Sequence, residues 1–417
     1  MQGDRSGPAF YDDSRESWTW ILFLPETDLN YLLLGAGLQG TAIAFDLLHQ
    51  APGTDQLVVV DASRANLVAL EKRLADDRLK TVCADVRDAG AMTQLMEAAD
   101  VAVSAVNYWF NATLAEFAVE GRAHFLDLGG NNDIVAKEFE LDGRAAAQGV
   151  SIIPDCGLAP GLAGILGYWL VDGLERAESL KLRVGGLPAN PLPPMNYKVV
   201  FSVQGLINEY IEPAVVIRDG RLKTVPSLSE LETVTFPEPF GELEAFQTSG
   251  GTSTLPRTLD GRVPNLDYKT IRYKGHCAQF RLLAELGLAD SKPREFKEGK
   301  VAPREMLARL MQEKLDLPGE DVVLLLAEAE GWTADQKAVR KTVRIIDHHD
   351  RTNDISAMMR MTGYPAAIIA WMLATGEIKA PGARCQELVV PGDIMIDQLR
   401  RRGVAIEVFT SDPGAPA

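Results

Sequence analysis

Short apolar runs alternate with amphipathic stretches over residues 30–153. The apolar runs predict strands, and the stretches between them, such as 38–49 and 64–75, carry the periodicity of helices. Strict alternation of strand and helix indicates a parallel sheet with helices on both faces. Six strands make a complete dinucleotide-binding domain, whereas the alternative, a flavodoxin-like sheet, has five. The six predicted strands cover residues 32–35, 57–60, 81–84, 101–106, 124–128 and 150–153.

The pattern changes after residue 160, where turn residues rather than helices separate the apolar runs. Arg218, Asp219 and Gly220 form a turn signal that closes a hairpin between two predicted strands. We therefore expect a second, α+β domain with a mixed or antiparallel sheet. Its predicted strands cover 180–185, 197–203, 214–217, 222–225, 269–273, 322–328 and 339–346, with a helix over 278–286.

The chain then returns to a helix, predicted over 364–375 with Pro365 at its start and Gly376 at its end. This helix is apolar on nearly all sides, so we expect it to pack back against the first domain. The expected organisation is an N-terminal tail (1–28), a Rossmann dinucleotide-binding domain (29–156), a substrate and dimerisation domain (157–355), a C-terminal segment that returns to the Rossmann domain (356–408) and a tail (409–417).

The net charge of the chain and the spacing of its cysteines argue against several classes of function. The chain has 42 Lys and Arg against 58 Asp and Glu, and its formal net charge of −16 argues against nucleic-acid binding. The densest basic cluster is Arg400, Arg401 and Arg402, and no apolar run approaches the ~18 residues of a membrane span. Four widely spaced cysteines without a C-x-x-C pair predict neither a metal site nor a disulfide framework. The N-terminal pattern is not that of a signal peptide, so we expect a cytoplasmic protein.

A G-x-G-x-x-G motif follows the first predicted strand and opens the first predicted helix. In this context Gly35 allows a tight turn, Gly37 lets the backbone approach a pyrophosphate, and Gly40 lets helix and strand pack closely. The helix N-terminus offers free N–H groups and a positive dipole end to the phosphates. The motif therefore predicts a dinucleotide site formed by Gly35, Gly37, Leu38, Gln39 and Gly40.

Asp61, at the end of the second predicted strand, indicates which dinucleotide binds. A carboxylate here accepts hydrogen bonds from the ribose hydroxyls of NAD and repels the extra phosphate of NADP, so NAD is predicted over NADP. Arg64 is the counter-argument, because an arginine can pair with a 2′-phosphate, although it can also stack on the adenine. Asp85, after the third strand, either reaches the adenine or caps the next helix.

Small and polar residues end the next three strands, at the edge where ligands of open parallel sheets bind. Ser104, Ala105 and Val106 would leave room for a nicotinamide ring. Asp127 is either a site carboxylate or a structural one that accepts hydrogen bonds from loop N–H groups. Cys156, after Asp155, is either a site residue or a buried small side chain.

These segments together resemble one protein family. S-A-V-N-Y at 104–108, D-C-G-L-A-P-G at 155–161 and R-Y-K-G at 272–275, with the glycine motif, are similar to the saccharopine dehydrogenase family from about residue 30 to about residue 408. Segments 202–210 and 248–254 most resemble its lysine 6-dehydrogenase members. The resemblance implies NAD-dependent oxidation of the ε-amine of free L-lysine to a semialdehyde that cyclises, with release of ammonia, by a homodimer.

The resemblance also implies a substrate pocket. Saccharopine-forming members typically carry Arg in place of Gln204, and that Arg grips a carboxylate of the glutamate half of their substrate. Glutamine cannot form an equivalent bidentate pair, so nothing here calls for a second amino acid on the lysine nitrogen. The implied substrate-binding residues are Asn107, Tyr108, Gln204, Thr248, Ser249, Gly250 and Gly251.

The reaction requires a base or a desolvating pocket, because the free pKa of an ε-amine is near ~10.4. The catalytic candidates are Asp127, Cys156, Lys198 and His276, with Asp155 beside them. His276 has a suitable unperturbed pKa, although a lone histidine is often structural. Lys198 is predicted in mid-strand, where burial lowers the pKa of a lysine unless its side chain reaches solvent.

Two alternatives stay open beside this function. A saccharopine-type or carboxynorspermidine-type dehydrogenase would act on a secondary amine. A non-catalytic protein that binds NAD would keep the dinucleotide site without turnover, since a fold alone does not imply a function.

Overall fold

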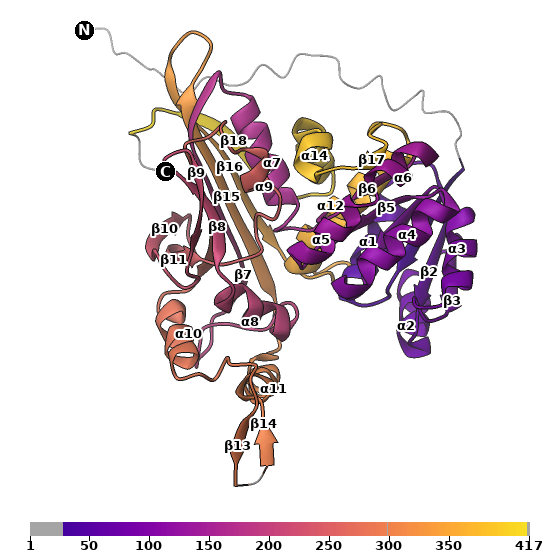
Figure 1. The fold of residues 1–417 in the computed structure, drawn as a ribbon, viewed down its shortest axis with the longest axis horizontal. Coiled ribbons are helices and arrows are strands. Elements are labelled where there is room, and N and C mark those ends of the chain that lie inside the picture. Colours follow the sequence, from indigo (N-terminus) through magenta and orange to yellow (C-terminus); the bar gives the residue numbers. More distant parts are fainter. Residues whose placement is uncertain (1–27, 298, 415–417) are drawn as a thin grey trace.

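The first sheet is parallel, with its strands in the order β17-β6-β5-β4-β1-β2-β3 (Figure 1). The computed structural model describes residues 28–297 and 299–414, so all but the last residue of the predicted tail over 1–28 lies outside the described residues. Apart from β17, the order is that of a Rossmann domain, which confirms the predicted fold class. The strands are β1 (Leu29–Leu34), β2 (Thr54–Asp61), β3 (Leu79–Cys83), β4 (Val101–Ser104), β5 (His124–Asp127), β6 (Ser151–Ile153) and β17 (Gly382–Ala383).

Helices cover both faces of this sheet (Figure 1). Successive residues of β1 point to opposite faces: Tyr31 and Leu33 pack with α1 and α12, and Leu32 and Leu34 pack with α3 and α4. The two-sided burial explains why the strands are continuous apolar runs. The helices of the first domain are α1 (Leu38–His49), α2 (Arg64–Leu74), α3 (Ala89–Glu97), the short η2 (Tyr108–Phe110), α4 (Asn111–Gly121), α5 (Asn132–Phe139) and α6 (Asp142–Gln148).

The second sheet is mixed, with the main order β10-β11-β12-β7-β15-β16-β18, with β8 joined to β12 and with β9 joined to β8. Only the β12–β7 pair is parallel among the pairings described in this sheet, which confirms the predicted α+β domain. Its strands are β7 (Arg176–Pro188), β8 (Ala214–Arg218), β9 (Arg221–Val225), β10 (Glu232–Phe236), β11 (Gly241–Gln247), β12 (Asn265–Arg272), β15 (Asp321–Trp332), β16 (Ala338–His348) and β18 (Ile406–Ser411).

The remaining elements surround the second sheet and the junction between the domains. A separate hairpin of β13 (Arg294–Phe296) and β14 (Gly299–Val301) projects from the molecule next to α11 (Figure 1). Among the described residues, no helix is both long and apolar enough to cross a membrane. The helices are α7 (Leu162–Asp172), α8 (Val203–Ile211), α9 (Leu255–Thr258), α10 (His276–Glu285), α11 (Pro303–Leu315), α12 (Ala357–Ala374), α13 (Gln386–Val389) and α14 (Gly392–Arg401).

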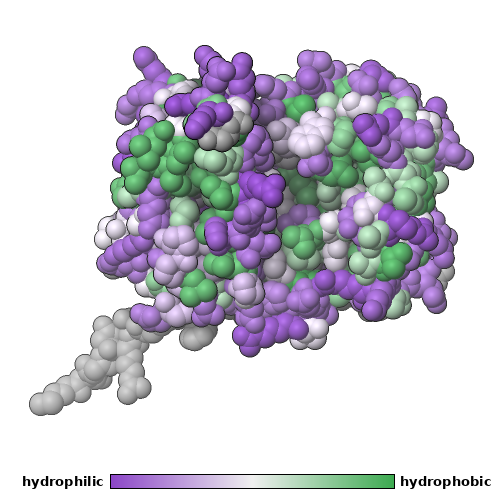
Figure 2. All heavy atoms as spheres, turned by 90° about the horizontal axis from the view of Figure 1, so that it is seen from below, coloured by the Kyte–Doolittle hydropathy of each residue, from purple (hydrophilic) through white to green (hydrophobic). Residues whose placement is uncertain are grey.

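Helix α12 joins the two domains. It packs against α1, β4 and β5 of the first domain and against β15 and β16 of the second. One continuous core cluster therefore runs from Leu33 through Ile368 to Leu325. Seen from below, the surface is hollowed between the two domains (Figure 2).

Three element predictions were wrong. Residues 197–203 are not a strand: the segment packs its alternating apolar residues against α8 and its neighbours, and α8 begins at Val203 because the Ser202 hydroxyl caps it. Helix α12 begins at Ala357, capped by Ser356, and keeps Pro365 inside it. Residues 409–411 belong to β18, which pairs with β16, so the predicted C-terminal tail starts too early.

Candidate functional site

The glycine loop between β1 and α1 has the geometry that a pyrophosphate requires. Gly35 has φ +106°, and a Cβ there would lie 2.8 Å from the carbonyl oxygen of Ala105. A Cβ on Gly40 would lie 1.9 Å from the carbonyl oxygen of Gly35, so only glycine lets α1 pack this closely. Gly37, by contrast, has open space at its Cβ position, which leaves the N-terminus of α1 accessible to a phosphate. The loop fits a dinucleotide.

The rest of the predicted loop flanks this N-terminus. Leu38 is exposed, and Gln39 is half-buried with a side-chain oxygen that has no hydrogen-bond partner among the described residues.

Asp61 ties the glycine loop to the end of β2. Its Oδ2 accepts the N–H of Ala36 at 2.8 Å, and its Oδ1 accepts the N–H of Ser63 at 2.7 Å. Each carboxylate oxygen has a second lone pair, so the half-buried side chain keeps acceptor capacity for a ribose. Arg64 begins α2, is exposed, and makes no ion pair within the described part of the chain. Both charged groups are available to a cofactor.

The side chain of Asp85 forms an ion pair with an arginine two residues further on. Its Oδ2 lies 2.5 Å from Nη2 of Arg87, and this hydrogen bond lowers the pKa of Asp85 to about 2. Helix α3 begins at Ala89 and is capped by Asp88, whose carboxylate accepts the N–H of Ala91 at 3.1 Å. The alternative that Asp85 caps this helix is therefore wrong, because the capping residue directly precedes the first helical one.

The segment after β4 packs against the glycine loop. Ala105 and Val106 surround the Cβ position of Gly35. Ser104 is buried, and its hydroxyl donates to Oδ1 of Asn111 at 2.8 Å, so its polar group is already satisfied.

The same segment meets the loop after β5. Asn107 is exposed, and the ring of Tyr108 lies so close to Gly130 that a Cβ there would be 2.9 Å from Cδ1. Tyr108 thus stands at the carboxyl edge of the first sheet.

Asp127 and Glu138 form a buried pair of carboxyl groups at this edge. Oδ1 of Asp127 accepts the N–H of Gly129 at 2.6 Å and that of Asp155 at 3.2 Å, as the structural interpretation of Asp127 predicted. Oδ2 of Asp127 and both oxygens of Glu138 lack a protein donor at hydrogen-bonding distance among the described residues. The two buried carboxyl groups act on each other, and a proton on one of them supplies the donor that the described residues do not. Burial raises the pKa of both groups, so the pair keeps that proton at neutral pH.

A third carboxyl group follows β6. Asp155 is buried, has φ +64°, and accepts a hydrogen bond from the hydroxyl of Ser253 in the second domain. Burial, with the charge of Asp127 second, raises the pKa of Asp155 to about 8. The carboxyl groups of Asp127, Glu138 and Asp155 therefore form one buried acidic cluster where the two domains meet.

Cys156 lies beside this cluster as a thiol. Its side chain is fully buried, and its Sγ donates to the carbonyl oxygen of Ile153 at 3.2 Å. Burial, and after it the charge of Asp127, raises the pKa of Cys156 well above its ordinary value. A neutral thiol can donate a hydrogen bond here but is a poor nucleophile.

The loop over 248–251 is fastened to α8 and β12. The hydroxyls of Thr248 and Thr270 lie 2.7 Å apart, and the N–H of Ser249 donates to the carbonyl oxygen of Glu209 at 2.9 Å. Gly250 is exposed, with φ +85°, and Gly251 packs directly on the ring of Tyr268.

Gln204 lies on a different face of α8. It is exposed, and its Oε1 accepts from Nε of Arg304 at 2.9 Å, on α11. Its amide also lies 3.5 Å from Oε2 of Glu305. The hydrogen bonds described for the Gln204 side chain therefore go to α11 and not to the loop over 248–251, with which the sequence grouped it.

His276 is placed inside the second domain. It is buried, with Nε2 3.1 Å from the hydroxyl of Tyr210 and Nδ1 3.2 Å from the carbonyl oxygen of Met195. Burial, and then the charge of Arg272, lowers the pKa of His276 to about 3. The ring is therefore neutral at physiological pH, with both nitrogens engaged.

Lys198 does not lie in a strand, so that prediction was wrong. It is half-buried, and its ammonium group donates to the carbonyl oxygen of Gly319. Neither Lys198 nor His276 forms a hydrogen bond with the first domain within the described residues.

Sequence reasoning missed two carboxyl groups. Glu138 shares the buried face of the amphipathic helix α5 with Val135, and a glutamate on such a face was the available signal. Glu209 lies half-buried on α8, and nothing in its local sequence distinguished it from a solvated helix residue.

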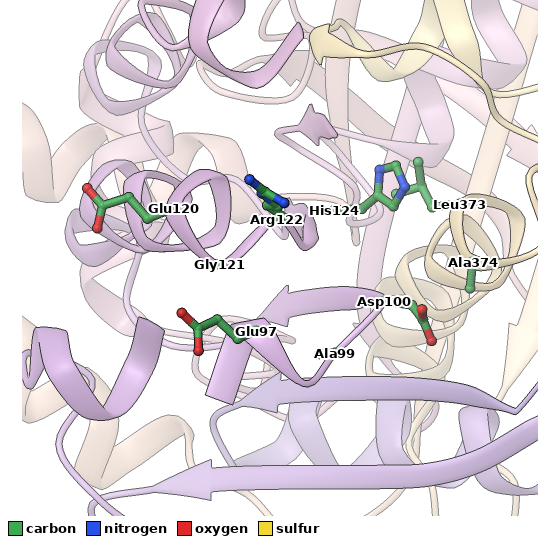
Figure 3. Close-up of a pocket in the computed structure, with 9 residues that line it drawn as sticks. All are labelled: Glu97, Ala99, Asp100, Glu120, Gly121, Arg122, His124, Leu373 and Ala374. Atoms are coloured by element: carbon green, nitrogen blue, oxygen red, sulfur yellow. The ribbon is translucent and has the colours of Figure 1, made fainter. Parts of the chain in front are cut away.

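One cavity of about 640 Å³ lies away from all of these residues (Figure 3). Glu97, Asp100, Glu120 and His124 line it, at the loops that precede β4 and β5. This is the amino edge of the first sheet, where helices α3 and α4 end and present the negative ends of their dipoles. Ligands of open parallel sheets bind at the opposite edge, so this cavity is not the dinucleotide site.

Comparison with known proteins agrees with the fold and the glycine loop. Residues 31–153 match the saccharopine dehydrogenase NADP binding domain, and residues 157–404 match the saccharopine dehydrogenase C-terminal domain. The chain is 25% identical to the NADP(+), L-glutamate-forming saccharopine dehydrogenase of Saccharomyces cerevisiae, over 75% of this chain and 70% of that one. It is 23% identical to the mitochondrial alpha-aminoadipic semialdehyde synthase of Mus musculus, over 70% of this chain but only 38% of that one.

Solved structures show the same architecture. The apo structure of histidine-tagged saccharopine dehydrogenase (L-Glu forming) from Saccharomyces cerevisiae has a TM-score of 0.74 at 21% identity, covering 92% of this chain and 100% of that one. Homospermidine synthase from Legionella pneumophila, in complex with NAD, has a TM-score of 0.63 at 11% identity, covering 93% and 94%.

A Rossmann domain with an open glycine loop, joined to a mixed-sheet domain, defines a two-domain protein that binds a nicotinamide dinucleotide. Since the two matched domains together span most of the chain, it belongs to the saccharopine dehydrogenase family. The names of its relatives support an oxidoreductase. They do not support the preference for NAD, because the matched domain and the yeast relative are both described as NADP-dependent.

Proposed function

We propose that this protein is a dehydrogenase that oxidises the ε-amine of free L-lysine to the semialdehyde, which cyclises, with release of ammonia. The observation that carries the proposal is the buried acidic cluster of Asp127, Glu138 and Asp155 at the carboxyl edge of the first sheet. That edge is where a dinucleotide held by the glycine loop places its reactive end. When bound, the nicotinamide accepts the hydride.

The acidic cluster would handle the protons of this reaction. The ammonium group must lose a proton before hydride can leave its carbon, and a base works best with a pKa near the operating pH. The pKa of Asp155 is raised to about 8, which suits this task. Water then adds to the resulting imine carbon, the C–N bond breaks, and the nitrogen leaves as ammonia. The Asp127–Glu138 pair holds one further proton beside Asp155.

The identity of residue 204 supports free lysine over saccharopine, because saccharopine-forming members typically carry Arg where this chain has the neutral Gln204. In this structure the Gln204 side chain contacts Arg304 and Glu305 of α11. The names of the relatives favour a secondary-amine dehydrogenase, of saccharopine or carboxynorspermidine type, as the second candidate.

The test supplies L-lysine with NAD or NADP and follows reduction of the cofactor, with ammonia measured in parallel. Reduction with release of equimolar ammonia is expected. Reduction with saccharopine or carboxynorspermidine but not with lysine would establish the second candidate. Cofactor binding without turnover of any of these amines would leave a non-catalytic dinucleotide-binding protein.

Asp61 supports NAD as the cofactor, because a carboxylate at the end of the second strand of a Rossmann domain accepts hydrogen bonds from the ribose hydroxyls and repels a 2′-phosphate. Arg64 and the names of the relatives support NADP. We expect Asp61→Ser to lower kcat/KM with NAD and raise it with NADP, moving the ratio by at least about fivefold, since one close charge repulsion is worth about 1 kcal/mol or more.

The matched control is Asp55→Ser, at an exposed position near the other end of β2. This change should leave the ratio of the two kcat/KM values unaltered. Equal activities with both cofactors before and after Asp61→Ser would contradict the role of Asp61.

A further inference from the structure

Glu209 is a carboxylate without a hydrogen-bond or ion-pair partner in the described part of the chain. It lies half-buried on α8, and none of its side-chain oxygens accepts a hydrogen bond from, or forms an ion pair with, any described residue. A carboxylate that loses hydration without gaining donors is costly, and burial accordingly raises the pKa of Glu209 to about 7. Such a group gains most from a ligand that brings a positive charge.

Arg272, on β12, is tied to α8 at the residue next to Glu209, because its guanidinium donates to the hydroxyl of Tyr210. It forms no salt bridge with Glu209, although the charges of the two groups act on each other. The guanidinium is almost fully buried. Nε donates to the hydroxyl of Tyr210 at 2.8 Å, and Nη1 donates to the carbonyl oxygen of Ile271 at 2.9 Å. Nη2 makes no hydrogen bond to any described residue. A cation and an anion therefore stand near each other, each with capacity left for a ligand.

The surroundings of this pair are aromatic. Arg272 lies 4.9 Å from the ring centroid of Tyr197 and 5.9 Å from that of Tyr210. The charged and titratable groups that act on Glu209, or on which it acts, are Arg272, Tyr197, Tyr210 and Tyr268. The tyrosines stay neutral because burial raises their pKa values, so only Arg272 and Glu209 carry charge here.

The loop over 248–251 adjoins the same place. Ser249 is bonded to the backbone of Asn208 and Glu209, and Gly251 rests on the ring of Tyr268. This loop, the end of α8 and β12 thus meet around Glu209.

We propose that Glu209 and Arg272 bind the α-ammonium and α-carboxylate groups of the amino-acid substrate. The proposal rests on the proposed function and narrows its substrate class to free α-amino acids that carry a distal amine. Opposite charges held near each other but unpaired match a zwitterionic head group. The ε-amine has no carboxylate beside it, so the reacting end of lysine does not match this pair.

Removing either group of the substrate, or its partner in the protein, tests the assignment. Nα-acetyl-L-lysine keeps the ε-amine and the α-carboxylate but lacks the positive charge of the α-ammonium group. 1,5-Diaminopentane has no carboxylate. In Glu209→Gln, KM for L-lysine should rise about 10- to 100-fold with kcat within about threefold, as for loss of one charge-assisted hydrogen bond. KM for Nα-acetyl-L-lysine should be the same in the wild type and in the variant.

Two further variants complete the experiment. Glu212→Gln changes an exposed carboxylate at the end of the same helix and should leave every KM unchanged. Arg272→Lys should raise KM for L-lysine but not for 1,5-diaminopentane, and its unfolding midpoint is measured because the site is buried.

The outcomes separate this proposal from the function it rests on. Equal loss of activity toward L-lysine and Nα-acetyl-L-lysine in Glu209→Gln, or no loss toward either, would overturn the head-group site. If the wild type oxidises no amine, the proposed function fails, and calorimetric titration with L-lysine then tests the site by itself. Tighter binding of L-lysine than of Nα-acetyl-L-lysine, abolished in Glu209→Gln, would support it, and equal binding would overturn it.

Discussion

Asp127 and Glu138 together hold a proton in the folded protein that the unfolded chain releases at neutral pH. An unfolded glutamate titrates near pH ~4.3, whereas burial, followed by the charge of Asp127, raises the pKa of Glu138 in the folded state. A raised folded-state pKa stabilises the fold at low pH. That stabilisation falls as the pH rises from the unfolded value towards the folded one.

Glu138→Gln removes this dependence, because an amide donates to Asp127 without a proton from solvent. Between about pH 6 and about pH 8, the unfolding free energy of the wild type should fall relative to the variant by up to about 1.4 kcal/mol per pH unit. Urea denaturation at several pH values measures the difference. Glu140→Gln, an exposed position on the next turn, is the control. Parallel stability curves for the wild type and Glu138→Gln would contradict a shared proton.

Single residues also show where sequence reasoning ends. The roles of Gly35 and Gly40 follow from the motif, because the positive φ of Gly35 and the contact between Gly40 and Gly35 both belong to one strand–turn–helix unit. Glu138 lies on the apolar face of its helix, but the sequence does not show that this face covers Asp127. Glu209 resembles any helix glutamate in the sequence, and only the elements packed over it make it unusual. The same is true of His276, whose ring is neutral because burial among four aromatic rings, and then the charge of Arg272, lower its pKa.

At the scale of elements, α1 and α12 cross where both carry small residues. A Cβ on Gly363 would lie 2.8 Å from Cβ of Ala42 and 3.3 Å from the backbone nitrogen of Ile43. Since α1 begins at the glycine loop, its position also sets the position of the phosphate site.

Gly363→Ala should therefore push the two helices apart, at a cost of about 1–3 kcal/mol in unfolding free energy, and weaken dinucleotide binding. Gly143→Ala, in α6, is the matched control because nothing lies within 4 Å of its Cβ position. This control should stabilise the protein by about 0.4–1 kcal/mol. Thermal unfolding and cofactor titration measure both effects, and equal behaviour of the two variants would contradict a close crossing.

The boundaries of helices and strands could be predicted where the hydrophobic periodicity and the capping residues indicate the same element. The predictions were wrong where these two signals differ. The first domain followed from its repeating strands and helices. Residues 197–203 alternate like a strand, yet no neighbouring strand pairs with them, because their apolar side chains complete the cluster around α8. Pro365 suggested a helix start, but the Ser356 cap begins α12 earlier and the helix continues through the proline.

At the scale of the molecule, a buried ion pair joins a segment near the start of the described chain to one near its end. Arg402 follows α14 and forms two hydrogen bonds to Asp46 of α1, at 2.6 and 2.9 Å, with both side chains almost fully buried. The basic cluster of the sequence therefore does not present three free charges to a nucleic acid.

Arg402→Ala should destabilise the protein by about 3–5 kcal/mol, because it leaves the Asp46 carboxylate buried without a partner. Arg401→Ala, the neighbouring change at an exposed i,i+4 pair with Asp397, should cost no more than about 1 kcal/mol. Chemical denaturation of both variants measures the two losses in unfolding free energy. Similar losses would show that Arg402 is no more important than a surface arginine.

The sequence by itself determined the class of fold, the dinucleotide loop and the family, because each depends on short-range spacing within one unit of structure. It also determined the candidate at Asp127, at the end of a parallel strand. Only the tertiary structure decided that Glu138 shares a proton with Asp127, that Gln204 faces α11, and that Glu209 and Arg272 lie near each other unpaired. Those properties arise from desolvation and from charges brought together across distant segments, and no local pattern records either.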